Sequence, residues 1–171
     1  MKKMLFILAI FSITLVFGQN RNSVDHFKFL GIPLNGTYEN FDKQLKNKGF
    51  EHLIEYAYCG VFDSDSVLLQ ACVTEKINNV YGVMITVNKF DTRSEAADCV
   101  DLLKSRFEYK YDGTFVDQGT FESLTIYNKL KKPFGHIFVS FRKVKDEYNV
   151  IVSYFDSANW QKDMEIYNQD L

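Results

Sequence analysis

The chain has 171 residues, of which 46% are hydrophobic and 16% aromatic, and its formal net charge is −2 at pH 7. This composition excludes a disordered polar chain and favours a sheet-rich globular domain. The mild negative charge and the scattered basic residues offer no surface for nucleic acid, so we expect no nucleic-acid partner.

The first 18 residues have the pattern of a secretory signal peptide. Lys2 and Lys3 precede an apolar run over residues 4–17, which ends in a small-x-small pattern at Gly18. The run is shorter than the roughly 20 residues of a membrane-spanning helix. We expect cleavage after residue 18 and a single domain over residues 19–171, with no stable membrane anchor after cleavage. The alternative is an uncleaved anchor. The predicted location is the periplasm, with secretion outside the cell as the second choice.

The segment GIPLNGT, residues 31–37, has the glycine spacing of a phosphate-binding P-loop. A P-loop needs a lysine directly after its second glycine, and here Thr37 and Tyr38 follow Gly36. Pro33 also removes a backbone donor. We interpret the segment as a turn and a helix cap, and we expect no cofactor. Thr37 is expected to cap an amphipathic helix over residues 37–48 that ends at Gly49.

Three strands are predicted next, over residues 53–62, 67–75 and 80–90, with turns at residues 63–66 and 78–79. In the third strand, one face is predicted to carry Tyr81, Val83, Ile85 and Val87.

The hydrophobic period then changes from that of a strand to that of a helix. Thr92 and Glu95 form a capping box. The apolar stripe that follows predicts a helix to about Tyr109, with a stop near residues 112–113; it consists of Ala96, Cys99, Val100, Leu103 and Phe107. Residues 114–130 fit either a strand or a short helix. Residues 136–143 and 148–155 are predicted to form a hairpin.

This order of elements predicts an α+β fold: a two-layer sandwich with an antiparallel sheet and two helices on one face. Two readings of the order stay open, a tandem αβββ repeat and a coincidence of element count.

No catalytic residue and no metal site can be assigned. His26, His52 and His136 lie in no zinc-binding spacing, and no serine-hydrolase elbow exists. The turn at residues 63–66 lacks the later ligands of a calcium loop. One catalytic alternative is a thiol–imidazole pair of Cys59 with a histidine, as in a hydrolase of unrecognised type.

Cys59 and Cys72 fall on facing arms of one predicted hairpin. If the turn centres on Ser64–Asp65, residue 59 faces residue 70, and the two cysteines are diagonal neighbours near the outer limit of disulfide reach. A turn shifted by one residue would place them opposite each other. A disulfide between Cys59 and Cys72 and two unpaired thiols are therefore both open, whereas Cys99 is assigned to the core.

Aromatic residues are the candidates for a binding surface, because tyrosine combines rigid apolar area with a polar tip. One group is on the early strands and one is near the C-terminus; the members are Tyr56, Tyr58, Tyr81, Tyr154 and Trp160. The alternative for each group is ordinary packing within the sheet.

Two ends of the chain carry a resemblance. The first contains GIPLNGT and the tripeptide Lys48-Gly49-Phe50, and the second contains residues 152–156 and Asn159. Both resemble small exported Gram-negative proteins of unknown function, which implies a small antiparallel α+β domain and no activity. The layout is also similar to the β-lactamase-inhibitor-protein-like fold, whose repeated units bind other proteins. Together with the missing catalytic motifs and the aromatic strand faces, this similarity predicts a non-enzymatic protein–protein interaction module with another exported protein as partner. The alternative is a small-molecule or saccharide binder with a tyrosine-lined pocket between helices and sheet.

Overall fold

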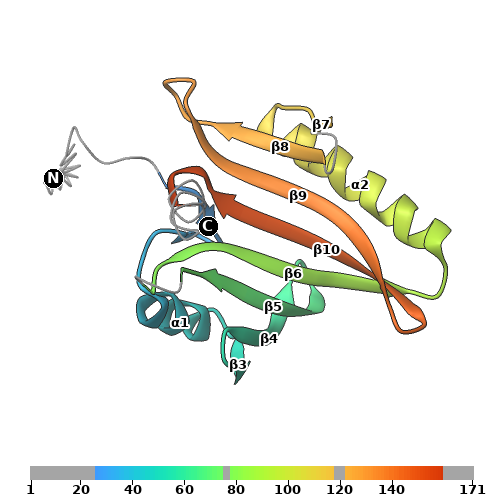
Figure 1. The fold of residues 1–171 in the computed structure, drawn as a ribbon, viewed down its shortest axis with the longest axis horizontal. Helices are drawn as coiled ribbons and strands as arrows, with labels where there is room; N and C mark the ends of the chain where they lie inside the picture. The colour runs from blue at the N-terminus through green and yellow to red at the C-terminus, as the bar shows by residue number, and fades with distance from the viewer. Residues whose placement is uncertain (1–25, 75–77, 118–121, 160–171) are drawn as a thin grey trace, which may run out of the picture.

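The computed structural model describes residues 26–74, 78–117 and 122–159. An eight-stranded antiparallel sheet dominates these residues (Figure 1). In chain order its strands are β3 (Glu51–Ile54), β4 (Ala57–Phe62), β5 (Asp65–Val73), β6 (Val80–Phe90), β7 (Val116–Asp117), β8 (Glu122–Tyr127), β9 (Pro133–Val144) and β10 (Glu147–Asp156). The predicted signal peptide, residues 1–18, lies outside the described residues.

The sheet consists of two similar halves. Helix α1 (Tyr38–Asn47) precedes β3–β6, and helix α2 (Arg93–Tyr111) precedes β7–β10. The spatial order is β3-β4-β5-β6-β10-β9-β8-β7, so the last strand of each half lies at the centre and pairs antiparallel with the other. The α+β class is therefore confirmed, and each half contains one more strand than the sequence predicts.

The extra strand in the first half comes from a tight turn. The predicted single strand over residues 53–62 is wrong, because β3 and β4 form a hairpin across Glu55 and Tyr56. Glu55 has φ of 30°, and its carbonyl accepts a hydrogen bond from Ala57 N–H at 2.6 Å. Neither glycine nor proline marks this turn, so the sequence carries no turn signal there.

The ends of both helices follow from their caps. Thr37 Oγ1 accepts a hydrogen bond from Asn40 N–H at 3.4 Å, and Thr92 Oγ1 accepts one from Glu95 N–H at 3.3 Å. Gly49 follows α1 with φ of 86°, a conformation that favours glycine. Asp112 ends α2 in the left-handed region.

Region 114–130 contains two strands. The short β7 pairs with β8, and β8 pairs with β9. Strand β9 begins at Pro133, three residues before the start predicted at residue 136. Residues 118–121 lie outside the described residues.

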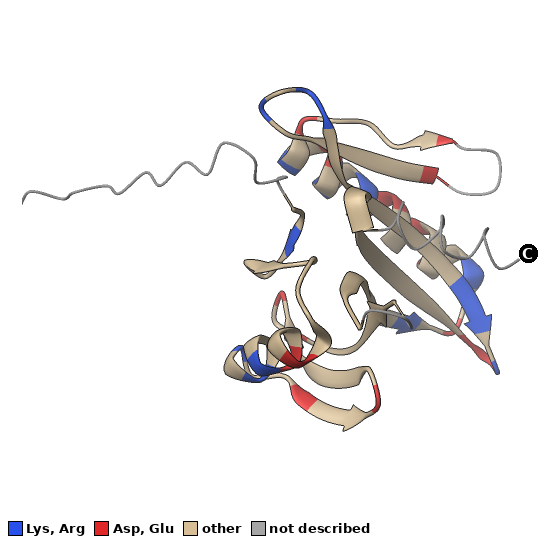
Figure 2. Cartoon of the chain, turned by 60° about the vertical axis from the view of Figure 1, so that its left-hand side comes forward, with Lys and Arg blue, Asp and Glu red and all other residues tan. Residues whose placement is uncertain are grey.

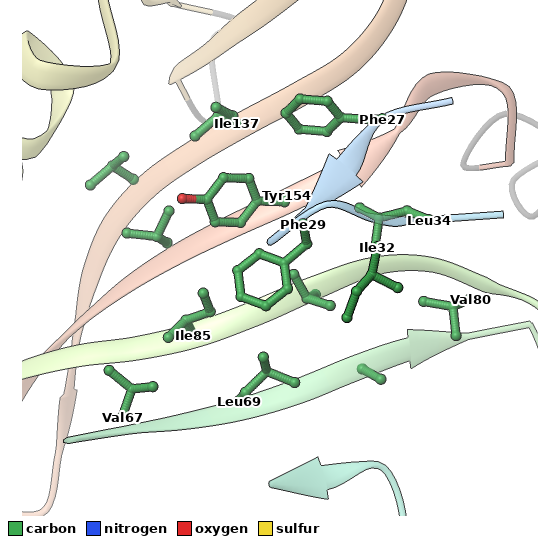
Figure 3. Packing of buried hydrophobic residues seen from close by; sticks show 14 of the residues in the cluster. Phe27, Phe29, Ile32, Leu34, Val67, Leu69, Val80, Ile85, Ile137 and Tyr154 are labelled. Carbon is green, nitrogen blue, oxygen red and sulfur yellow. The ribbon is translucent and has the colours of Figure 1, made fainter. Parts of the chain in front are cut away.

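The hydrophobic core fills the space between one sheet face and the elements that cover it (Figure 3). The hairpin of β1 (Lys28–Phe29) and β2 (Ile32–Pro33) covers the centre, where the ring of Tyr154 packs against Phe27 and Phe29. Phe107 of α2 packs edge-on against Tyr154, with 6.0 Å between ring centroids. Both helices therefore lie on the same side of the sheet, as predicted.

A buried carboxylate fastens the N-terminal hairpin to the end of β10. The side chain of Asp156 is fully buried and accepts hydrogen bonds from Phe27 N–H at 2.8 Å and Asn159 N–H at 3.0 Å. Its Oδ2 also lies 3.0 Å from His26 Nδ1. Asn159 donates its side-chain amide to the carbonyl of Leu34 at 2.9 Å. The two ends that carry the family resemblance therefore lie side by side.

Candidate functional site

The register of the sheet determines which residues lie on the face opposite the helices. Tyr58, which contacts α1, pairs with Leu69, and Tyr154, which contacts α2, pairs with Val83. The strand residues that alternate with these four point to the opposite face of the sheet, away from both helices. We call this side the helix-free face, since none of α1, α2 and the β1–β2 hairpin packs on it.

Three rows of cross-strand neighbours make up the central part of the helix-free face. The first row is Cys59, Leu68, Thr86, Ile151 and Ser140; the second is Ala57, Gln70, Met84, Ser153 and Phe138; the third is Cys72, Gly82, Phe155, His136 and Thr125.

None of these residues is Asp, Glu, Lys or Arg. Charged residues of the same face lie around them: Glu51 pairs with Cys59 at the edge of the first row, and the neighbouring row contains Lys89, Asn149 and Arg142. Figure 2 shows the same pattern, with charged residues gathered on helices, turns and strand ends while the middle of the long strands is uncharged. A sheet face that is solvated over its whole area is usually polar and charged. The central part of the helix-free face therefore has the composition of a contact surface.

A groove of about 660 Å³ lies on the helix-free face over strands β3 to β6. Its floor includes the adjacent residues Cys59, Leu68 and Thr86 of the first row. Leu68 is 50% exposed, and Val61 beside it is 62% exposed. Of the residues that line the groove, Glu51 and Lys89 are charged, and Lys89 lies 3.5 Å from Glu147.

Tyr58 and Tyr154 do not form the binding surface predicted from the sequence. Tyr58 is 0% exposed and Tyr154 is 5% exposed, and both contribute to the core. Each lies on the face that the helices cover, so the packing alternative is correct for both. The small-molecule alternative, with a tyrosine-lined pocket between helices and sheet, stays a prediction.

Tyr58 belongs to a polar network between α1 and the β3–β4 hairpin. Its hydroxyl lies 2.8 Å from Tyr38 Oη and 2.9 Å from Asp42 Oδ1. Burial, followed by the bonds to Tyr38 and Asp42, raises the pKa of Tyr58. Asp42 in turn accepts from Lys46 at 2.8 Å. A tyrosine held protonated in this way anchors the helix and is not available as a base.

Tyr56 also contacts this helix. Its ring packs edge-on against Tyr38, with 4.8 Å between centroids. Tyr56 and Tyr58 therefore meet the same residue of α1, and neither contributes to the helix-free face.

Tyr81 lies on the helix-free face, contrary to the predicted alternation with Val83 and Ile85. A register shift between Cys72 and Val73 inserts one extra residue in β6. The ring of Tyr81 stacks on Phe155 at 6.0 Å between centroids, and Phe155 meets Phe138 at 5.5 Å.

Sequence reasoning missed the aromatic cluster around Phe155. The signal lies in the alternation of the strands: Phe138 follows the buried Ile137, and Phe155 follows the buried Tyr154. His136, whose Nδ1 lies 3.3 Å from Thr125 Oγ1, adjoins the cluster, and burial lowers its pKa. Trp160, the remaining predicted aromatic residue, lies outside the described residues.

The structure contradicts the disulfide between Cys59 and Cys72. The turn between β4 and β5 occupies Asp63 and Ser64, so Cys59 faces Leu68 and not residue 70 or 72. Four positions along β5 then separate the two cysteines, about 13 Å at the rise of a strand. Cys99 packs at the edge of the core, with Asn88 Nδ2 3.7 Å from its sulfur.

The geometry required by the thiol–imidazole alternative is not found around Cys59. His52 pairs with Tyr58 and so faces α1, whereas Cys59 is on the helix-free face. His136 is on β9, four strands from β4, on the order of 19 Å away.

Among the described residues, no group of three or more His, Cys, Asp or Glu side chains is placed to hold a metal ion. No described helix is long and apolar enough to cross a membrane. Comparison of the chain with known protein families, curated proteins and solved structures finds no match.

Proposed function

We propose that this protein is an exported, non-enzymatic interaction module that binds another exported protein through the groove on its helix-free face. The observation that supports the proposal is a sheet face with an uncharged central part and a half-exposed leucine, Leu68, in the groove on that face. The proposed location is the periplasm. The similarity of layout to the β-lactamase-inhibitor-protein-like fold stays a prediction.

The groove favours a protein segment with apolar, uncharged side chains. Leu68 and Val61 expose apolar area that a partner would remove from water, at about 25 cal/mol for each Å² buried. Thr86 and Ser66 on the same surface offer hydroxyl groups for hydrogen bonds to a partner's backbone. The groove is shallow and open, so several inserted side chains suit it better than one enclosed ligand.

The test is capture of a partner from periplasmic extract by the tagged mature protein, followed by titration of the purified pair. The Leu68→Lys variant places a charge in the groove and is expected to weaken binding at least tenfold. The matched control is Leu102→Lys on α2, because Leu102 is 54% exposed and lies on the helix side. Equal binding by both variants, or capture that Leu68→Lys leaves unchanged, would contradict the proposal.

A further inference from the structure

A second pocket, of about 390 Å³, lies on the opposite side of the molecule, where α2 meets two turns of the chain. One turn joins β1 to β2 at Leu30, and the other joins β4 to β5 at Asp63. The pocket is formed entirely by described residues and is separate from the proposed protein-binding groove, apart from Val61 at the rim that both share.

The walls of this pocket are apolar. Phe62 of β4 and Phe107 of α2 form two sides, with Leu103 one helical turn before Phe107. Phe62 is held in place by stacking on Phe29 at 5.7 Å between centroids. A pocket of this size and composition can enclose one aromatic ring with a short aliphatic chain.

The hydroxyl of Tyr154 is a polar group at the base of the pocket. The side chain is 5% exposed, lines the pocket, and forms no hydrogen bond with any described residue. Its ring packs against Phe29, with 5.5 Å between centroids (Figure 3), and against Phe107, with 6.0 Å between centroids. Burial, with smaller contributions from Tyr111 and Asp63, raises the pKa of Tyr154, so the hydroxyl keeps its proton. Among the described residues, the buried polar side-chain atoms without a partner are Asn149 Oδ1 and Ser157 Oγ, and the Tyr154 hydroxyl is not one of them. The hydroxyl is therefore open to the pocket, where a ligand oxygen can accept a hydrogen bond from it.

Two positively charged side chains of α2 line one side of the pocket. Arg106 and Lys110 are one turn apart on α2 and both line it, and neither is ion-paired with a described residue. One carboxylate, Asp63, lines the other side. Two positive charges against one negative charge favour an anionic ligand. A guanidinium group binds a carboxylate with two parallel hydrogen bonds.

From these contacts we propose that the pocket binds a small amphipathic carboxylate. The apolar body lies between Phe62, Leu103 and Phe107, and the carboxylate pairs with Arg106. An oxygen atom on the far end of the ligand accepts a hydrogen bond from Tyr154.

Three probes that differ in one group each test this assignment by calorimetric titration of the mature protein. The first is para-methoxyphenylbutyrate, which has a carboxylate at one end and a methoxy (ether) oxygen on the ring at the other end. Phenylbutyrate lacks the ether oxygen, and para-methoxyphenylbutanol lacks the charge. We expect the first probe to bind most tightly and each of the others to bind about five- to tenfold more weakly, the loss of one hydrogen bond or one screened ion pair.

Two variants assign the contacts. Arg106→Gln should bring the affinity for para-methoxyphenylbutyrate down to that for the alcohol. Tyr154→Phe should remove the preference for the methoxy probe over phenylbutyrate while leaving the affinity for phenylbutyrate unchanged. Arg142→Gln, an exposed arginine on β9 outside the pocket, is the matched control and should bind like the unmodified protein.

Absence of binding by all three probes at millimolar concentration would overturn the proposal. So would binding that Arg106→Gln and Tyr154→Phe leave unchanged in correctly folded protein, as judged by the melting temperature. Leu68 does not line this pocket, so the two proposals are tested independently. Protein binding can be disproved while carboxylate binding is confirmed, and carboxylate binding can be disproved while protein binding is confirmed.

Discussion

Asn159 donates its side-chain amide to the backbone carbonyl of Leu34, 2.9 Å away and 125 positions earlier in the chain. The bond is buried and joins the segment after β10 to the GIPLNGT turn. Together with the bonds that Asp156 accepts from Phe27 and Asn159, it fixes the N-terminal hairpin over the core. The hairpin in turn supplies Leu30 to the proposed carboxylate pocket.

The first prediction concerns this bond. Asn159→Ala should lower the free energy of unfolding by about 1–3 kcal/mol, because it leaves the buried Leu34 carbonyl without a donor. Urea unfolding measures the change. Asn47→Ala at the exposed end of α1 is the control and should change stability by less than about 0.5 kcal/mol. Equal unfolding curves for the two variants would show that the bond contributes no net stability.

The second prediction concerns pH and the carboxylate of Asp42. Burial acts to raise its pKa, but hydrogen bonds from Lys46 and Tyr58 outweigh burial, and the pKa lies below its ordinary value of 3.8. The ionised form therefore stabilises the folded state above pH 3.8, and this contribution is lost as the pH falls through the lowered pKa.

Asp42→Asn should accordingly be less stable than the unmodified protein at neutral pH, and the difference should shrink as the pH falls below 3.8. Chemical unfolding at a series of pH values measures it. Asp98→Asn, an exposed acid on α2, should show no such trend. A difference that is constant with pH would argue against the lowered pKa.

The third prediction concerns the close approach of β9 to the N-terminal hairpin. A Cβ atom at Gly135 would lie 2.4 Å from the ring of Phe27, which is packed against Phe134 and Tyr154 and cannot withdraw. Gly135→Ala should therefore destabilise the fold by about 1–3 kcal/mol, or about 2–4 °C in melting temperature for each kcal/mol.

Gly36→Ala is the comparison for this overpacking. Its added Cβ would meet only the side chain of Asn40 at 3.5 Å, an ordinary contact. If Gly135→Ala and Gly36→Ala have the same melting temperature, the ring of Phe27 does not lie where the structure places it.

The fourth prediction concerns the thiols. The sequence holds three cysteines, and the strand register keeps Cys59 and Cys72 apart. Titration of the unreduced, urea-unfolded mature protein should therefore find three reactive thiols per chain. A single thiol would indicate the Cys59–Cys72 disulfide and a different register for β4 and β5.

Local signals predicted the helices well. The ends of α1 and α2 follow from Thr37, Gly49 and the Thr92–Glu95 capping box, all of which act within a few residues of the chain. The two long strands β6 and β10 were also predicted within one residue, since alternation over ten or more positions is a strong signal.

Turns without marker residues were not predictable. The β3–β4 turn is formed by Glu55 and Tyr56, which carry no local preference for it. The extra residue that moves Tyr81 to the helix-free face depends on how β6 aligns with β5, and pairing between strands is not visible within one strand.

By itself the sequence determined the α+β class, the helix boundaries, and the alternation of the long strands away from the bulge at Tyr81, because caps and periodicity act over short stretches of chain. The tertiary structure alone decided which of those faces the helices cover. Helix packing took Tyr58 and Tyr154 into the core and left Leu68 exposed, because the side that buries more apolar area against α1, α2 and the hairpin is favoured. The pocket beside α2 is lined by Leu30, Asp63, Arg106 and Tyr154, which lie far apart along the chain, so only folding brings them together.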